Sequence, residues 1–212
     1  MKIGIIGATG KLGSILTKKL AIDGEDVTAI VRHPERLNSR KNIHILNKDL
    51  FDLKPEDVQI FDVVISTYGP SVDKPQQLVD AMQHLADIFS EQKIKLVVTG
   101  GVGPLYLDNS KNLRVADSTD VPKPFVALAK AEAKSFDILK QAYNVDWLYF
   151  APAFELSTNR ASALEYVISG DVLRFADDGT SSLSYELYAD AIVNLIQTKP
   201  SISHEIISVS EK

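Results

Sequence analysis

Near its N-terminus the sequence reads Lys2-Ile3-Gly4-Ile5-Ile6-Gly7-Ala8-Thr9-Gly10-Lys11-Leu12-Gly13. The apolar, β-branched residues at its start predict a buried strand over 2–6. Glycines spaced G-x-x-G-x-x-G then indicate a tight turn, and apolar residues at helical spacing predict a helix over 11–22. Such a turn lets the backbone approach a pyrophosphate group, which meets free N–H groups at the positive end of the helix. The stretch therefore predicts the first strand–turn–helix unit of a dinucleotide-binding fold.

The same alternation of short apolar runs and amphipathic stretches continues to the end of the chain. Further strands are expected over 26–31, 42–46, 61–66, 95–99, 146–150 and 205–209, and further helices over 75–91, 124–143 and 184–198. Strands that alternate with helices indicate a parallel sheet covered on both faces. We expect one α/β domain over 1–212, with a doubly wound, mostly parallel sheet and three αβα layers. The expected strand order is 3-2-1-4-5-6, with a seventh strand at the edge.

Two long stretches, 102–123 and 151–182, interrupt this rhythm. Loops of this length in a compact domain are usually functional. Both follow the carboxyl end of a predicted strand, where ligands bind in open α/β sheets. We expect 151–182 to form a small cap on the substrate side.

Composition excludes several classes of protein. The 212 residues include 23 Lys plus Arg and 28 Asp plus Glu, so the formal charge is −5, which argues against a nucleic-acid partner. There is no cysteine, and the four histidines are scattered, so no metal site is predicted. No apolar run approaches the roughly 18 residues of a membrane helix. We expect a cytoplasmic protein with no membrane partner.

The end of the second predicted strand bears on cofactor choice. It reads Ile30-Val31-Arg32-His33, with no acidic residue to bind the ribose 2′-hydroxyl of NAD. The Arg32 guanidinium could pair with a 2′-phosphate, and His33 could add a donor. This pattern favours NADP(H) over NAD(H). The alternative is that Arg32 is an ordinary surface arginine at a strand end.

Two motifs carry a resemblance to a known family. Gly-Ala-Thr-Gly-Lys-Leu-Gly at 7–13, followed by Val-Arg-His-Pro-Glu-Arg-Leu at 31–37, resembles the atypical short-chain dehydrogenases with an NAD(P)-binding Rossmann fold. The most similar group is the small bacterial proteins described as NADH-flavin reductases, related to biliverdin reductase B and the NmrA-like regulators. Weaker matches follow in order along nearly the whole chain, at 66–70, 97–101, 147–153 and 184–191.

The resemblance implies a set of cofactor-binding residues, each placed by its position in a motif. The pyrophosphate would be held by Gly7, Thr9, Gly10, Lys11 and Leu12. The phosphate on the adenosine ribose would be met by Arg32 and His33, and adenine would be flanked by Asp49 and Leu50. The nicotinamide and its ribose would be lined by Thr67, Tyr68, Thr99 and Gly100.

The catalytic Tyr-x-x-x-Lys pair of classical short-chain dehydrogenases is absent. None of the seven tyrosines has a lysine four residues later. The best alignment puts Val126 in the tyrosine position and Lys130 in the lysine position, with Thr99 near the expected catalytic serine. Thr99 and Lys130 are therefore the catalytic candidates. The missing phenol argues against an alcohol dehydrogenase or a sugar-nucleotide epimerase, because both need that acid.

Hydride transfer does not require the phenol when the acceptor takes its proton from solvent, as a flavin or a quinone can. The sequence therefore favours an NAD(P)H-dependent oxidoreductase that reduces a small flavin-like or quinone-like acceptor. Flat surfaces for such a ring could come from Tyr68, Tyr106, Phe125 and Phe154. The alternative is an NmrA-like, NADP-sensing regulatory protein without turnover. A homodimer would be compatible with either function.

Overall fold

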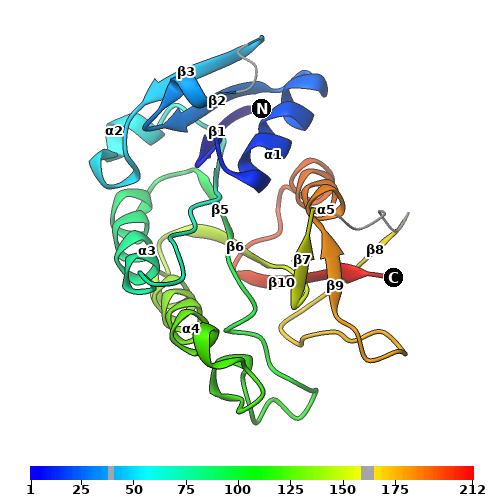
Figure 1. Cartoon of the computed structure of the whole chain (residues 1–212). Coiled ribbons are helices and arrows are strands. Elements are labelled where there is room, and N and C mark those ends of the chain that lie inside the picture. Colours follow the sequence, from blue (N-terminus) through cyan, green and yellow to red (C-terminus); the bar gives the residue numbers. More distant parts are fainter. Residues whose placement is uncertain (38–40, 159–164) are drawn as a thin grey trace.

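The computed structural model describes residues 1–37, 41–158 and 165–212, and its centre is an eight-stranded sheet (Figure 1). The sheet has the order β3-β2-β1-β4-β5-β6-β10-β8. Its strands are β1 Lys2–Ile6, β2 Asp26–Val31, β3 Ile43–Asn47, β4 Val63–Ser66, β5 Lys95–Thr99, β6 Asp146–Ala151, β8 Tyr166–Ser169 and β10 Glu205–Glu211. The helices are α1 Lys11–Ile22, α2 Pro55–Val58, α3 Gln76–Phe89, α4 Val126–Gln141 and α5 Tyr185–Thr198.

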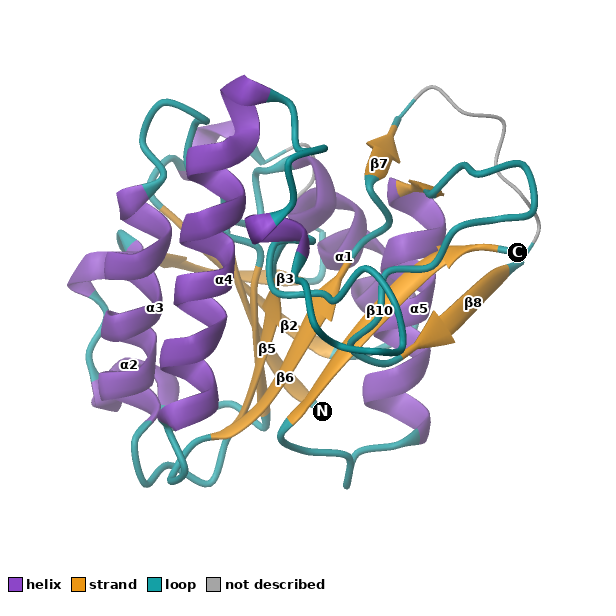
Figure 2. Ribbon diagram, turned by 90° about the horizontal axis from the view of Figure 1, so that it is seen from below, coloured by secondary structure: helices purple, strands orange, loops and turns teal. Residues whose placement is uncertain are grey.

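Helices cover both faces of the sheet, as the nearly continuous apolar strands require. All four residues of β4 are buried, and so are the last four of β1. One core cluster packs α3 and α4 against the sheet, and a second cluster packs α1 and α5 against it (Figure 2). The three-layer α/β architecture is thus confirmed. Among the described residues, no helix is long and apolar enough to cross a membrane.

The predicted order of the first six strands is confirmed, but the predicted edge is wrong. The strand at Glu205–Glu211, β10, pairs in parallel with β6 and is not at the edge. Strand β8 pairs antiparallel with its other side, with Val209 opposite Ile168. The stretch 151–182 therefore extends the sheet and does not form only a cap. Its β7, Glu155–Ser157, pairs separately with β9, Ser182–Ser184.

The other long stretch, 102–123, packs against the core cluster that includes α4. Leu105 and Val115 are buried in the same cluster as α4. Backbone hydrogen bonds from Tyr106 N to Asp171 O and from Leu173 N to Tyr106 O, both 2.8 Å, join it to the second long stretch. The two stretches are thus joined at Tyr106. Short 3₁₀ turns punctuate the connections, at Pro34–Arg36 (η1), Leu50–Asp52 (η2), Val115–Asp117 (η3) and Lys123–Phe125 (η4).

Candidate functional site

The glycine turn between β1 and α1 has the conformation that the motif predicts. Gly7 has a φ of +80°, which favours glycine, and its carbonyl accepts from Gly10 N at 2.8 Å. A Cβ on Gly13 would lie 2.2 Å from the Gly7 oxygen, so helix and turn could not keep this spacing with any larger residue. The turn is therefore built for close backbone packing.

The N-terminus of α1 has neither a side-chain cap nor a negative charge, so it can accept an anion. Its N-cap, Gly10, provides no side-chain cap, and the first turn holds no acidic residue. In α5, by contrast, Ser184 Oγ accepts from Leu187 N at 3.2 Å, and Glu186 lies in the first turn. The first N–H groups of a helix have no intrahelical acceptor, so those of α1 are left for a ligand such as a pyrophosphate.

The predicted pyrophosphate residues differ in what they can contribute there. Thr9 and Lys11 are exposed, whereas the Leu12 side chain is buried in the core, so only its backbone faces the turn. The Lys11 ammonium lies 5.9 Å from the centre of the Tyr185 ring, over the start of α5. The two helix N-termini are thus neighbours at the carboxyl edge of the sheet.

The structure brings Arg32 and Asp49 together at the ends of β2 and β3. Arg32 Nε lies 3.3 Å from Asp49 Oδ2, and 66% of the arginine side chain is exposed. Asp49 Oδ1 also accepts from Phe51 N at 2.9 Å, which fixes the carboxylate. His33 Nδ1 lies 3.2 Å from the Glu35 carboxylate, also on the surface. Asp49 therefore orients the guanidinium, a role that sequence reasoning did not assign to it.

Leu50 does not flank a ligand through its side chain, because it is 4% exposed and belongs to the core. The next residue, Phe51, is 43% exposed and packs edge-on against Tyr68, with ring centres 6.1 Å apart. Burial, followed by the Asp49 charge, raises the pKa of Tyr68. Tyr68 thus lies beside Phe51, and its predicted role at the nicotinamide stays a prediction. Phe51 is the residue that sequence reasoning missed.

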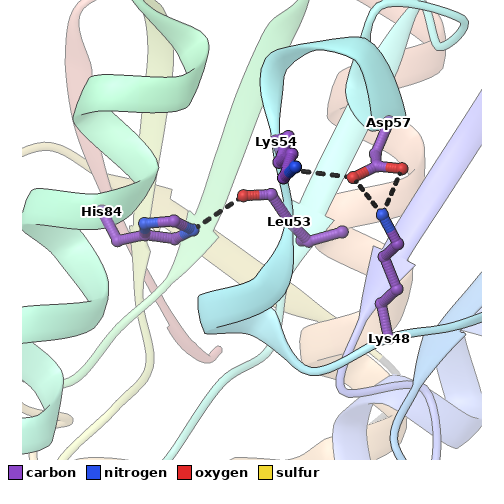
Figure 3. Close-up of polar contacts among 5 residues, drawn as sticks. All are labelled: Lys48, Leu53, Lys54, Asp57 and His84. Atoms are coloured by element: carbon purple, nitrogen blue, oxygen red, sulfur yellow. Dashed lines mark hydrogen bonds and ion pairs between the residues drawn. The ribbon is translucent and has the colours of Figure 1, made fainter.

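The segment that carries Phe51 is held at two points (Figure 3). Lys48 Nζ lies 2.7 Å from both carboxylate oxygens of Asp57, which also accepts from Lys54 N. The Lys48 ammonium accordingly lowers the pKa of Asp57. His84 Nε2 of α3 lies 3.1 Å from Leu53 O, so this histidine joins a helix to the segment.

Two threonines link neighbouring strand ends at the same edge. Thr67 Oγ1 donates to Ile6 O at 2.9 Å and lies 3.2 Å from Gly7 O. It therefore joins the end of β4 to the first residue of the glycine turn. Thr99 Oγ1 donates to Ser66 O at 3.2 Å. Both hydroxyl groups therefore make internal bonds, and the predicted ligand roles of Thr67 and Thr99 stay predictions.

A half-buried acid lies next to the loop that follows β5, and sequence reasoning did not find it. Glu132 of α4 accepts from Gly103 N at 3.0 Å, and burial raises the pKa of its carboxyl group to about 7. A Cβ on Gly101 would lie 2.0 Å from Glu132 Oε1, and one on Gly100 would lie 1.9 Å from the Tyr149 hydroxyl. These two glycines are thus explained by internal packing. A signal for Glu132 was available in the sequence. The residue lies three positions after Ala129, on a face of α4 that is rich in buried alanine.

Comparisons with known proteins agree with this geometry. A family model described as NAD(P)H-binding matches residues 7–199. The chain belongs to this NAD(P)H-binding family. The Bacillus subtilis protein YwnB is 32% identical over 214 residues, which span 100% of this chain and 99% of that protein.

Solved structures of similar proteins share the whole fold. A Streptococcus pneumoniae protein described as a "putative NADH-flavin reductase" is 31% identical, with a TM-score of 0.92 and full coverage of both chains. A Bacteroides thetaiotaomicron protein described as a "putative epimerase" is 26% identical, with a TM-score of 0.86 over 99% of this chain and 96% of that one.

Within this member of the NAD(P)H-binding family, the remaining candidates are dispersed. Lys130 is exposed on α4. Glu132 follows it by two positions, which corresponds to a rotation of roughly 200° about the helix axis. Lys130 therefore faces away from the loop that Glu132 contacts. Phe125 and Phe154 are 47% and 44% exposed. Tyr106 lies elsewhere, in a pocket with Trp147 and His204 near the amino ends of β6 and β10, so it does not belong to the predicted stacking surface.

Proposed function

We propose that the protein is an NAD(P)H-dependent reductase that prefers NADPH and reduces a flavin-like or quinone-like acceptor. The observation that carries this proposal is the uncapped N-terminus of α1 behind a glycine turn, with Arg32 at the end of the neighbouring strand. The similarity to a protein described as an NADH-flavin reductase supports the choice of reaction.

The chain's own residues would act mainly by binding and orientation. The N–H groups of the first turn of α1 would bind the pyrophosphate, and Arg32, held by Asp49, would pair with the 2′-phosphate. Phe51 and Tyr68 would offer apolar surface beside adenine. The nicotinamide supplies hydride when it is bound. The acceptor ring would lie against one exposed aromatic face, that of Phe125 or of Phe154, and take its proton from solvent.

Calorimetric titration with NADPH and NADH tests the cofactor part of the proposal. Arg32→Ala should weaken NADPH binding by roughly tenfold or more, because a charge-assisted pair is lost, and should leave NADH binding unchanged. Arg36→Ala is the matched control, since Arg36 is exposed in the same loop. Equal weakening of both nucleotides, or an equal effect of the control, would contradict the assignment of Arg32.

Turnover separates a reductase from a sensor. NADPH oxidation should be followed at 340 nm with FMN and with menadione as acceptors. Saturable oxidation would support the reductase. Tight NADPH binding without oxidation by either acceptor would instead favour an NADP-sensing regulatory protein, the function that the missing Tyr-x-x-x-Lys pair would suit.

A further inference from the structure

The pocket that contains Tyr106 and Trp147 lies at the other edge of the sheet from the glycine turn. Its volume is about 460 Å³, within the usual range for small-molecule sites. Trp147, the second residue of β6, and His204, just before β10, stand at the amino ends of their strands, whereas the glycine turn lies at the carboxyl edge. The pocket is therefore separate from the proposed cofactor site.

Flat side chains form the walls of this pocket. The Trp147 indole meets Phe136 edge-on, with ring centres 5.9 Å apart, and meets His204 at 5.5 Å. Tyr106 lies under the Arg114 guanidinium, 5.7 Å from its ring centre. Backbone bonds between the two long stretches hold Tyr106 in place. Such walls accept a planar aromatic ring.

Trp147 carries an unmatched hydrogen-bond donor. The residue is 3% exposed, and its indole Nε1 is shielded from solvent and finds no acceptor within the part of the chain that the structure describes. A ligand in the pocket would therefore meet the indole ring and not this N–H group.

The charges at the pocket favour an anion. Arg114 forms two 3.0 Å bonds with Asp137, and Lys111 pairs with Asp171 at 2.8 Å. Lys140 also lines the pocket, and none of the ion pairs found among residues 1–37, 41–158 and 165–212 involves it. Its ammonium is thus available to a negative group, and a carboxylate offers oxygen acceptors as well.

We propose that this pocket is a binding site for a small aromatic carboxylate. The ring would lie between Trp147 and Tyr106, and the carboxylate would meet Lys140. The proposal does not depend on the proposed reductase function.

Trp147 is the only tryptophan of the chain, so its emission, excited at 295 nm, reports directly on this pocket. Titration with 4-fluorobenzoate should give a saturable change in emission and a matching change in the ¹⁹F NMR signal. 4-Fluorobenzyl alcohol, the neutral analogue, should bind at least roughly tenfold more weakly, because it cannot pair with Lys140.

Variants test which residues bind the probe. Lys140→Gln should weaken 4-fluorobenzoate binding by roughly tenfold, whereas Lys134→Gln, an exposed lysine of the same helix, should leave it unchanged. Trp147→Phe, followed by ¹⁹F NMR, reduces the area of the aromatic wall and should also weaken binding. No saturable change in emission, equal binding of the alcohol, or equal effects of the two lysine variants would overturn the proposal.

Discussion

Glu132 is a single residue whose charge is costly in its surroundings. Its carboxyl group is packed behind the Gly101–Gly103 loop, where its hydrogen-bond donor is the backbone N–H of Gly103. The first cause of its raised pKa is burial, which disfavours the charged form, and the N–H bond offsets only part of this effect. The residue therefore takes up or releases a proton near neutral pH, beside the strand end at which Thr99 and Gly100 lie.

This titration has a definite effect on stability. The ordinary value of 4.5 applies to the unfolded chain, and the folded value is about 7. At a pH between these two pKa values, the native state holds a proton that the unfolded state has released. This group therefore lowers the free energy of unfolding as pH rises from 5 to 8. Glu132→Gln removes the titration and keeps an acceptor for Gly103 N. The free energy of unfolding is measured in urea at pH 5 and at pH 8. Relative to the wild type, the variant should gain on the order of 2 kcal/mol between these two pH values.

Glu205→Gln, at the exposed first position of β10, is the control for this comparison. It should change the free energy of unfolding by the same small amount at every pH. If Glu132→Gln behaved like this control, with pH profiles parallel to the wild type, the carboxyl group would be ionised throughout and its proposed titration would be wrong.

At the scale of the element, the junction of β1, the glycine turn and α1 depends on contacts that only glycine permits. A Cβ on Gly13 would meet the Gly7 carbonyl at 2.2 Å and Thr67 Oγ1 at 2.8 Å, and the first of these is backbone. Helix α1 would have to move away from the strand. Gly13→Ala should therefore cost about 2 kcal/mol or more of stability and abolish nucleotide binding. Thermal unfolding and NADPH titration measure the two effects.

Gly170→Ala is the matched control, because a Cβ there would have nothing within 4 Å. It should leave both the melting temperature and NADPH binding close to those of the wild type. Normal NADPH binding by Gly13→Ala would show that the close packing of turn and helix is not needed for the cofactor.

The same junction shows how far the sequence predicts the structure. The bounds of β1, α1, β2 and β5 agree with the sequence patterns, because local periodicity and glycine spacing are enough to define them. Strand β8 was missed because its four residues are half-exposed at an edge and are held by pairing with β10, a contact distant in sequence. Spacing also could not distinguish Leu50, which turns into the core, from Phe51, which is 43% exposed.

In the candidate site, too, local features could be predicted from the sequence and long-range contacts could not. Motif position predicted the glycine turn and the neighbourhood of Arg32, but the Arg32–Asp49 pair and the burial of Glu132 arise only when distant segments come together. The Tyr106 pocket was likewise hidden, because its walls come from two long stretches, from α4 and from the starts of two strands.

At the scale of the whole molecule, both core clusters draw on distant parts of the chain. The cluster under α3 and α4 runs from Ile6 to Leu173, and the cluster under α1 and α5 runs from Ile3 to Val209. Neither face of the sheet can therefore be covered by one contiguous part of the chain. We propose that residues 1–212 unfold as one cooperative unit, which is the behaviour of a single domain.

Two optical signals test this proposal because they report on different regions. Trp147 emission follows β6 and its contact with α4, whereas far-ultraviolet circular dichroism follows all the helices, including α1 on the other face of the sheet. In guanidinium chloride the two transitions should have the same midpoint and slope. Saturating NADPH, proposed to bind at the α1 end, should shift both midpoints equally, since a ligand stabilises the whole cooperative unit. Separate midpoints, or a shift confined to the dichroism signal, would mean that parts of the chain unfold independently.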